Sequence, residues 1–162
     1  ALDCKLVNCL VGKAPAEDPA QVRRTLIDNL RYAAAALERE GIRLLVEPLN
    51  PQDMPGFYLY GTRGALQVME EVGHPNLFLQ YDVYHMQIVE GNLMRTIQAN
   101  LDRIAHIQIA DNPGRNEPGT GEIHFPNLFA FLDRIGYTGW IGCEYKPAGR
   151  TEEGLGWMTP YR

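Results

Sequence analysis

Four side chains that carry oxygen atoms lie at or near the ends of short apolar segments: Glu47, Asp82, Gln108 and Glu144. Segments of this kind are typical of buried parallel strands, so we expect each residue near the C-terminal end of a strand. Taken singly, Glu47 could be a solvated strand terminus, Asp82 could cap a helix, and Gln108 could be a satisfied core amide. Glu144 lies among apolar neighbours, where a charge needs a partner.

Taken together, the four side chains predict a divalent metal site. Carboxylate and amide oxygens are the ligands that Mg²⁺ and Mn²⁺ prefer. Carboxylates gathered at one level of a sheet would repel one another unless a cation lay between them. We therefore expect the side-chain oxygens of Glu47, Asp82, Gln108 and Glu144 to converge on one point.

Two further residues are candidates for binding a substrate beside the metal. His85 follows Asp82 by three residues and could hydrogen-bond a substrate oxygen, or could be a loop or helix-capping histidine. Arg115 lies in a polar segment rich in Gly and Pro, residues 112–121, and could bind a carboxylate through its guanidinium or remain a solvated charge. His106 shares a strand face with Gln108 by parity, but lies deeper and is left out of the predicted site.

Strand-like and helix-like segments alternate along the chain and must position these residues. Short strands that are apolar on both faces, with helices between them, predict an α/β fold with a parallel sheet. A doubly wound sheet and part of a TIM barrel both fit, but polar residues at the ends of several strands favour the barrel, where those ends ring one mouth. The expected strands are 5–12, 43–49, 76–81, 104–109 and 139–145, and the expected helices are 21–40, 62–72, 92–101 and 126–135.

Charge and composition argue against several classes of protein. The formal net charge is −5 and no long Lys/Arg run occurs, which disfavours a nucleic-acid surface. No apolar run approaches the roughly 18 residues that span a bilayer. The three cysteines form no CxxC pair, which indicates reduced thiols and a cytoplasmic protein. We expect a single domain over residues 1–162 and a small-molecule partner, with a homo-oligomer left open.

Several motifs resemble one known family. In order, they are LVEPLN (45–50), QYDVYH (80–85), GNL (91–93), HIQIA (106–110) and WIGCEYKP (140–147), with further likeness over 115–123 and 151–157. This set is similar to the hydroxypyruvate isomerase and 2-oxo-tetronate isomerase group of the xylose-isomerase-like TIM barrels. The resemblance covers essentially the whole chain.

The resemblance implies a ligand set, catalytic groups and a reaction. In the family a metal is held by a Glu, an Asp, a His or Gln, and a second Glu, which fall on Glu47, Asp82, Gln108 and Glu144. The Gln argues against a ketose 3-epimerase. The two glutamates imply an acid–base pair, and the substrate-contacting histidine falls on His85. The implied reaction interconverts hydroxypyruvate and tartronate semialdehyde through a metal-stabilised enediolate, with Mg²⁺ or Mn²⁺ as cofactor.

Three rival interpretations stay open at this point. The nearest is a 2-oxo-tetronate isomerase of the same group. An endonuclease IV-type nuclease shares the barrel, but it would need many histidines and a basic face, whereas this sequence has four histidines and a negative net charge. The third is a truncated, non-catalytic relative.

Length is where the chain departs from the family. A complete barrel has about 250 residues and eight strands. The segments of this chain resemble only the fourth to the eighth strands, and it begins with Ala and runs directly into an apolar segment, so we expect a chain that starts inside a longer protein. Such a partial barrel should form an open crescent with an apolar concave face, lined by residues of 6–7, 44–46 and 78–79 and by Ile141.

Overall fold

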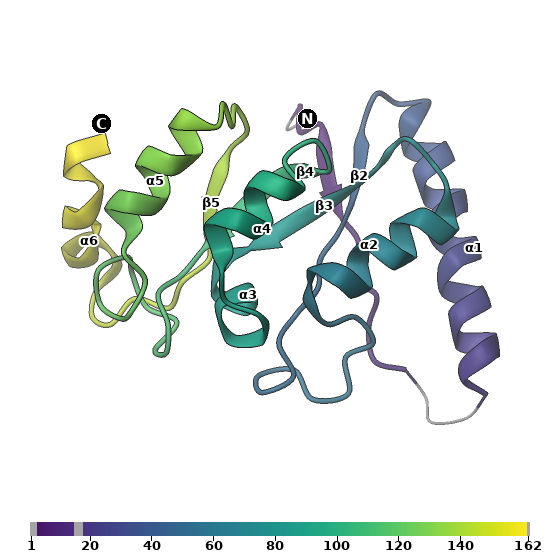
Figure 1. Cartoon of the computed structure of the whole chain (residues 1–162), viewed down its shortest axis with the longest axis horizontal. Coiled ribbons are helices and arrows are strands. Elements are labelled where there is room, and N and C mark those ends of the chain that lie inside the picture. Colours follow the sequence, from purple (N-terminus) through teal and green to yellow (C-terminus); the bar gives the residue numbers. More distant parts are fainter. Residues whose placement is uncertain (1–2, 15–17, 162) are drawn as a thin grey trace.

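The computed structural model describes residues 3–14 and 18–161. Its centre is a sheet of five strands in the order β1-β2-β3-β4-β5, and every neighbouring pair is parallel (Figure 1). The predicted α/β fold with a parallel half-barrel is confirmed. The strands are β1 (Leu6–Asn8), β2 (Arg43–Val46), β3 (Leu77–Asp82), β4 (Ile104–Ile109) and β5 (Ile141–Cys143).

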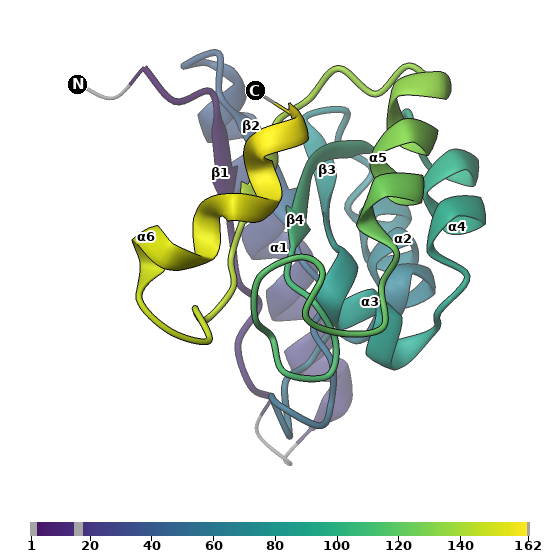
Figure 2. The same cartoon turned by 90° about the vertical axis from the view of Figure 1, so that its left-hand side faces the viewer.

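Helices connect the strands, as parallel pairing requires. Asp18 starts the first of them by accepting a hydrogen bond from the Gln21 main-chain N–H at 3.0 Å, next to Pro19 in the first turn. Helices α2, α4 and α5 lie along the same side of the sheet (Figure 2). The helices are α1 (Pro19–Glu38), α2 (Gly61–Val72), α3 (Val83–Val89), α4 (Leu93–Ala99), α5 (Phe125–Arg134) and α6 (Thr151–Gly154), with a 3₁₀ segment η1 (Leu155–Tyr161) at the end.

The main core lies between the sheet and these helices. Leu44, Val46 and Leu79 are almost fully buried there, against helical residues such as Leu30 and Ala65. The burial of these strand residues is the chief reason that the helices pack on this side, because apolar burial stabilises a fold by about 25 cal/mol per Å².

The opposite, inner face of the sheet is more polar than the sequence suggested. Partners in a parallel ladder share a face, and the inner residues Asn8, Glu47, Gln80 and Gln108 are joined by side-chain hydrogen bonds across four strands. The expected apolar concave face was therefore wrong in part: Leu44, Val46 and Leu79 point into the helix-covered core instead. Leu45 and Phe78, which pair with each other on the face of Asn8, are apolar exceptions, whereas Ile141, also expected on the concave face, packs against the helix-covered core.

One irregularity interrupts the pairing of β3 with β4. Leu79 pairs with Ile104, but the next residue, Gln80, pairs with His106, so Ala105 has no partner on β3. This is a β-bulge, which inserts one residue into a strand and changes the face that later residues take. Ile104 consequently joins the main core, while His106 and Gln108 lie on the inner face.

The observed elements differ from the predicted ones in two ways. Strands β1, β2 and β5 are shorter than the expected 5–12, 43–49 and 139–145, and β2 and β5 end directly before Glu47 and Glu144. Helix α3, the short helix α6 and the segment η1 were not predicted. Within residues 3–14 and 18–161, none of the helices combines the length and apolarity that crossing a bilayer requires.

Candidate active site

Glu47 lies directly after β2, on the inner face at the C-terminal end of the sheet. Its side chain is almost completely buried, with 4% of the residue exposed. Glu47 Oε2 accepts hydrogen bonds from Asn8 Nδ2 at 2.7 Å and from Gln80 Nε2 at 2.8 Å. The neighbouring strands β1 and β3 therefore hold this carboxylate from both sides.

Asp82 ends β3 and begins α3. Its Oδ1 accepts from the main-chain N–H groups of Tyr84 at 2.8 Å and His85 at 3.2 Å, which makes it the N-cap of the helix. The other oxygen, Oδ2, lies 3.9 Å from His85 Nε2. The capping role and the ligand role that the sequence left open for Asp82 are therefore compatible, since each can use a different carboxylate oxygen.

His85 lies on the first turn of α3 and is buried. Its Nδ1 accepts from the Asn50 main-chain N–H at 3.2 Å and lies 2.7 Å from Asn50 Nδ2. Potential ligand atoms of Glu47, Asp82 and His85 all lie within 4.8 Å of one another, close enough to surround one ion. These three residues form the tightest part of the predicted site.

Gln108 is connected to this group through Gln80. Gln80 Nε2 donates both to Gln108 Oε1, at 2.6 Å, and to Glu47 Oε2. A carbonyl oxygen has a second lone pair, so Gln108 Oε1 retains an acceptor position toward the site. Gln80 was missed by the sequence analysis, although a polar residue at the same strand parity as Asp82 was a usable signal.

Glu144 follows β5, and its side chain is 54% exposed. Glu144 Oε2 accepts from Arg115 Nη2 at 2.9 Å, and the Arg115 guanidinium stacks over the Tyr84 ring, 5.1 Å from its centroid. The structure thus places two predicted site residues in direct contact, with Arg115 reaching back over α3 from the loop that follows β4.

The electrostatics of the cluster favour a cation. Burial, together with the charges of Asp82 and Glu144, raises the pKa of Glu47 to about 7. Burial also raises the pKa of Asp82 to about 6, with Glu144 again contributing. A positive ion between these groups would offset both effects, and the donor set of carboxylate and amide oxygens suits a hard divalent metal.

Burial has the opposite consequence for His85. It lowers the pKa of the imidazole to about 4, helped by the charge of Arg115. The ring is therefore neutral at physiological pH and acts through hydrogen bonds of one donor and one acceptor nitrogen.

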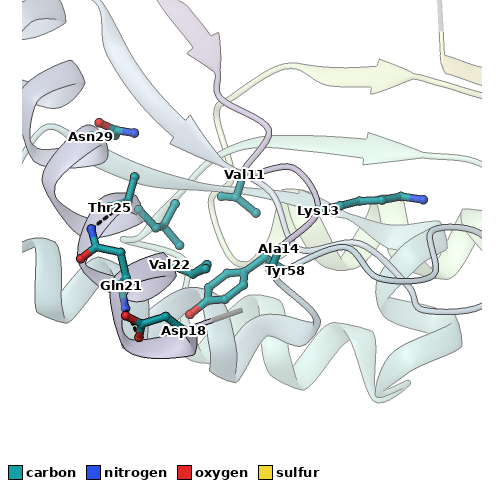
Figure 3. Close-up of a pocket in the computed structure, with 10 residues that line it drawn as sticks. Val11, Lys13, Ala14, Asp18, Gln21, Val22, Thr25, Asn29 and Tyr58 are labelled. Atoms are coloured by element: carbon teal, nitrogen blue, oxygen red, sulfur yellow. Dashed lines mark hydrogen bonds between the residues drawn. The ribbon is translucent and has the colours of Figure 1, made fainter. Parts of the chain in front are cut away.

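A separate cavity lies between the first turns of α1 and the segment after β1 (Figure 3). It measures about 400 Å³ and is lined by residues that include Val11, Lys13, Gln21, Thr25 and Tyr58. No predicted site residue lines it, so it is distinct from the acidic cluster on the inner face.

Comparison with known sequences and structures adds independent information. Residues 1–161 match the sequence model of a family described as xylose isomerase-like TIM barrel. The chain is 55% identical to hydroxypyruvate isomerase of Escherichia coli, with 100% of this chain and 63% of the relative covered. It is 45% identical to 2-oxo-tetronate isomerase of Pectobacterium atrosepticum, with 99% and 62% covered.

Among solved structures, one described as AP endonuclease, family 2 from Brucella melitensis superimposes with a TM-score of 0.95. That chain is 43% identical, and the match covers 99% of this chain and 62% of that one. The chain thus spans about three fifths of the length of the relatives that it matches.

Proposed function

Because the chain belongs to the family of xylose isomerase-like TIM barrels, we propose that its gene product is an isomerase that interconverts hydroxypyruvate and tartronate semialdehyde. The observation that carries this proposal is the 55% identity to a hydroxypyruvate isomerase along the whole chain. The relative is longer, so the activity is proposed for the intact gene product.

Two glutamates are proposed as the acid–base pair. The reaction removes a proton from the hydroxymethyl carbon of hydroxypyruvate and delivers one to the neighbouring carbonyl carbon, while the hydroxyl proton moves from the oxygen of the first carbon to that of the second. This proposal is supported by the proximity of the two carboxylates, which lets the charge of Glu144 raise the pKa of Glu47.

The proposed cofactor is Mg²⁺ or Mn²⁺, held by Glu47, Asp82, Gln108 and Glu144. When bound, such an ion would polarise the substrate carbonyl and stabilise the negative charge of the enediolate. The support in this chain is the buried Glu47–Asp82 pair and the amide oxygen of Gln108, which belong to the oxygen-rich donor set that these metals prefer.

Arg115 and His85 are proposed to bind the oxo acid. Arg115 donates to Glu144 through one Nη2 proton, which leaves further guanidinium donors for a substrate carboxylate. His85 lies beside Asp82 and offers its Nε2 toward the same space. The proposal includes a cytoplasmic location, in keeping with the free thiols of Cys4, Cys9 and Cys143, and allows a homo-oligomer.

The test uses the intact gene product with Mg²⁺ or Mn²⁺ in D₂O. Incubation with hydroxypyruvate should yield tartronate semialdehyde, and NMR should show deuterium entering at carbon through the enediolate. Parallel incubation with a 2-oxo-tetronate tests for 2-oxo-tetronate isomerase activity instead. Equal or faster turnover of the four-carbon acid would reassign the substrate within the same mechanism, and no exchange with either acid would refute the isomerase.

A second candidate is a nuclease, favoured by the name of the Brucella melitensis structure. It requires binding to a polyanion, which a net charge of −5 opposes. The discriminating assay is cleavage of duplex DNA that contains one abasic site, with Mg²⁺, Mn²⁺ or Zn²⁺ supplied. Metal-dependent incision that the Glu47→Gln substitution abolishes would favour this candidate over the isomerase.

A further inference from the structure

Asn50 contacts the imidazole of His85 with both its main chain and its side chain. The main-chain N–H donates to His85 Nδ1 at 3.2 Å, and Asn50 Nδ2 lies 2.7 Å from the same nitrogen. Asn50 is 0% exposed and His85 is 2% exposed, so little solvent competes for these contacts. Two groups from the loop after β2 therefore converge on one ring nitrogen of α3.

The orientation of the Asn50 amide is fixed by a third residue. Asn50 Oδ1 accepts from the Asp53 main-chain N–H at 2.8 Å, and Asn50 Nδ2 donates to Asp53 Oδ2 at 3.0 Å. Turning the amide by 180° would set its oxygen against a carboxylate and its NH₂ against an N–H, so both contacts would become repulsive. The amide must therefore present its NH₂, and not its oxygen, to His85.

These contacts determine which nitrogen of His85 carries the proton. A main-chain N–H can only donate, and the oriented Asn50 NH₂ is also a donor, so Nδ1 must accept. A neutral imidazole that accepts at Nδ1 has its proton on Nε2. Nε2 lies 3.9 Å from Asp82 Oδ2, at the edge of the acidic cluster.

We infer that Asn50 is a positioning residue that fixes His85 as the Nε2–H tautomer, so that His85 donates a hydrogen bond to a substrate oxygen and does not ligate the metal. An Nε2 that bears a proton has no lone pair to give to a cation. The inference deepens the proposed function and rests on it, because the oxygen that receives the bond belongs to the oxo acid.

The hydrogen bonds around Asp53 also support Arg115, the second residue that is proposed to bind the substrate. The Tyr84 hydroxyl donates to Asp53 Oδ2 at 2.7 Å, and the Tyr84 ring lies beneath the Arg115 guanidinium. Asp53 Oδ2 thus accepts from Asn50 and Tyr84 together. The loop after β2 consequently fixes the start of α3, from which both His85 and the Arg115 stacking surface project.

The tautomer can be measured directly. Long-range ¹H–¹⁵N NMR spectra of the intact gene product, labelled with ¹⁵N-histidine, distinguish a protonated Nε2 from a protonated Nδ1. The His85 signals are assigned by their loss in His85→Gln. We expect the Nε2–H pattern in the unsubstituted protein. A wild-type spectrum with the Nδ1–H pattern would overturn the inference without any need for a variant.

The Asn50→Asp variant provides a second test of the inference, because a carboxylate of the same shape accepts hydrogen bonds where the Asn50 NH₂ donates them. We expect the Nδ1–H tautomer to gain population and kcat/KM to fall about tenfold or more, the usual scale for a lost hydrogen bond. The matched control is Asn76→Asp. Asn76 Nδ2 donates to the carbonyl oxygens of Ala34 and Ile42, so its substitution should lower stability and leave the His85 tautomer unchanged.

The outcomes separate this inference from the proposed function. An unchanged Nε2–H pattern in folded Asn50→Asp would show that the Asn50 side chain does not set the tautomer, and would overturn its role as a positioning group. The expected spectra from both proteins, together with no turnover of any oxo acid, would refute the isomerase but leave the Asn50–His85 relationship established.

Discussion

Arg115 Nη2 lies 2.9 Å from Glu144 Oε2, although the two residues belong to loops that follow different strands. The guanidinium therefore adjoins a proposed acid–base carboxylate and lies over the Tyr84 ring. A substrate carboxylate bound by Arg115 would be held beside Glu144. In the proposed reaction, the geometry of this pair would determine how far the substrate reaches into the cluster.

Replacement of Arg115 by Lys should weaken substrate binding, because an ammonium keeps the charge but cannot form the paired N–H contacts of a guanidinium. We expect KM for the oxo acid to rise about 10- to 100-fold, the range for hydrogen bonds to charged groups, with a smaller change in kcat. Steady-state kinetics measure both. Arg150→Lys, at a side chain that is 78% exposed, is the control. An unaltered KM in Arg115→Lys would remove this residue from substrate binding.

Glu47→Gln and Glu144→Gln should each reduce turnover about 10²- to 10⁴-fold, since an amide cannot exchange the proton that a general acid or base must move. Because the amide oxygen can still approach a metal, calorimetric titration with Mn²⁺ should show weakened binding and not its abolition. The exposed Glu152→Gln serves as the reference substitution. Either site variant turning over at the parental rate would exclude that glutamate from the chemistry.

The stability of the metal-free protein should decrease as the pH rises from about 4.5 to about 7. Glu47 has a pKa of about 7 when folded, against 4.5 ordinarily, so over this window the folded state binds more protons than the unfolded state. The loss is up to about 3 kcal/mol for this residue, and Asp82 acts in the same direction. Urea unfolding with EDTA, at several pH values, measures it.

In that experiment the free energy of unfolding of Glu47→Gln should depend less on pH than that of the parent protein. Added Mg²⁺ should stabilise the parent more at pH 7 than at pH 5, because it competes with protons for the carboxylates. A parental free energy of unfolding that increases through this window would contradict the assigned environment of Glu47.

The 162-residue chain expressed alone should associate or aggregate and should lack isomerase activity. Its sheet ends in β1 and β5, each paired on one side within the described residues, and open strand edges invite pairing with other chains. Size-exclusion chromatography with light scattering would test this. A monodisperse, cooperatively melting and active monomer would refute it.

Much of the sheet could be predicted because its strands are short, apolar and separated by amphipathic helices. Helix α3 escaped prediction because Val83–Val89 has no polar face: Val83, Tyr84, His85 and Met86 are all buried. Without a 3.6-residue period, the segment looked like a loop. Asp82, as an N-cap, was the remaining signal.

The sequence pointed to candidate residues of the site, but not to the contacts that orient them. Glu47 and Asp82 lie close together as expected, but the partners that orient the cluster, among them Asn50, Asp53 and Gln80, were not identified. Hydrogen bonds such as Asn50–His85 join residues 35 positions apart. Their geometry depends on how loops fold back over the sheet, which residue periodicity does not encode.

The bulge at Ala105 gives β4 one residue more than its ladder with β3 needs. Ile104 faces the helix-covered core, whereas His106 and Gln108 lie on the inner face, opposite Gln80 and Asp82. Removing Ala105 would leave a regular strand in which Ile104 and Ile107 still face the helices and His106 and Gln108 still face the cluster, because side chains alternate between the two faces. A library of single deletions should therefore retain variants that lack Ala105 and lose those that lack Gln108.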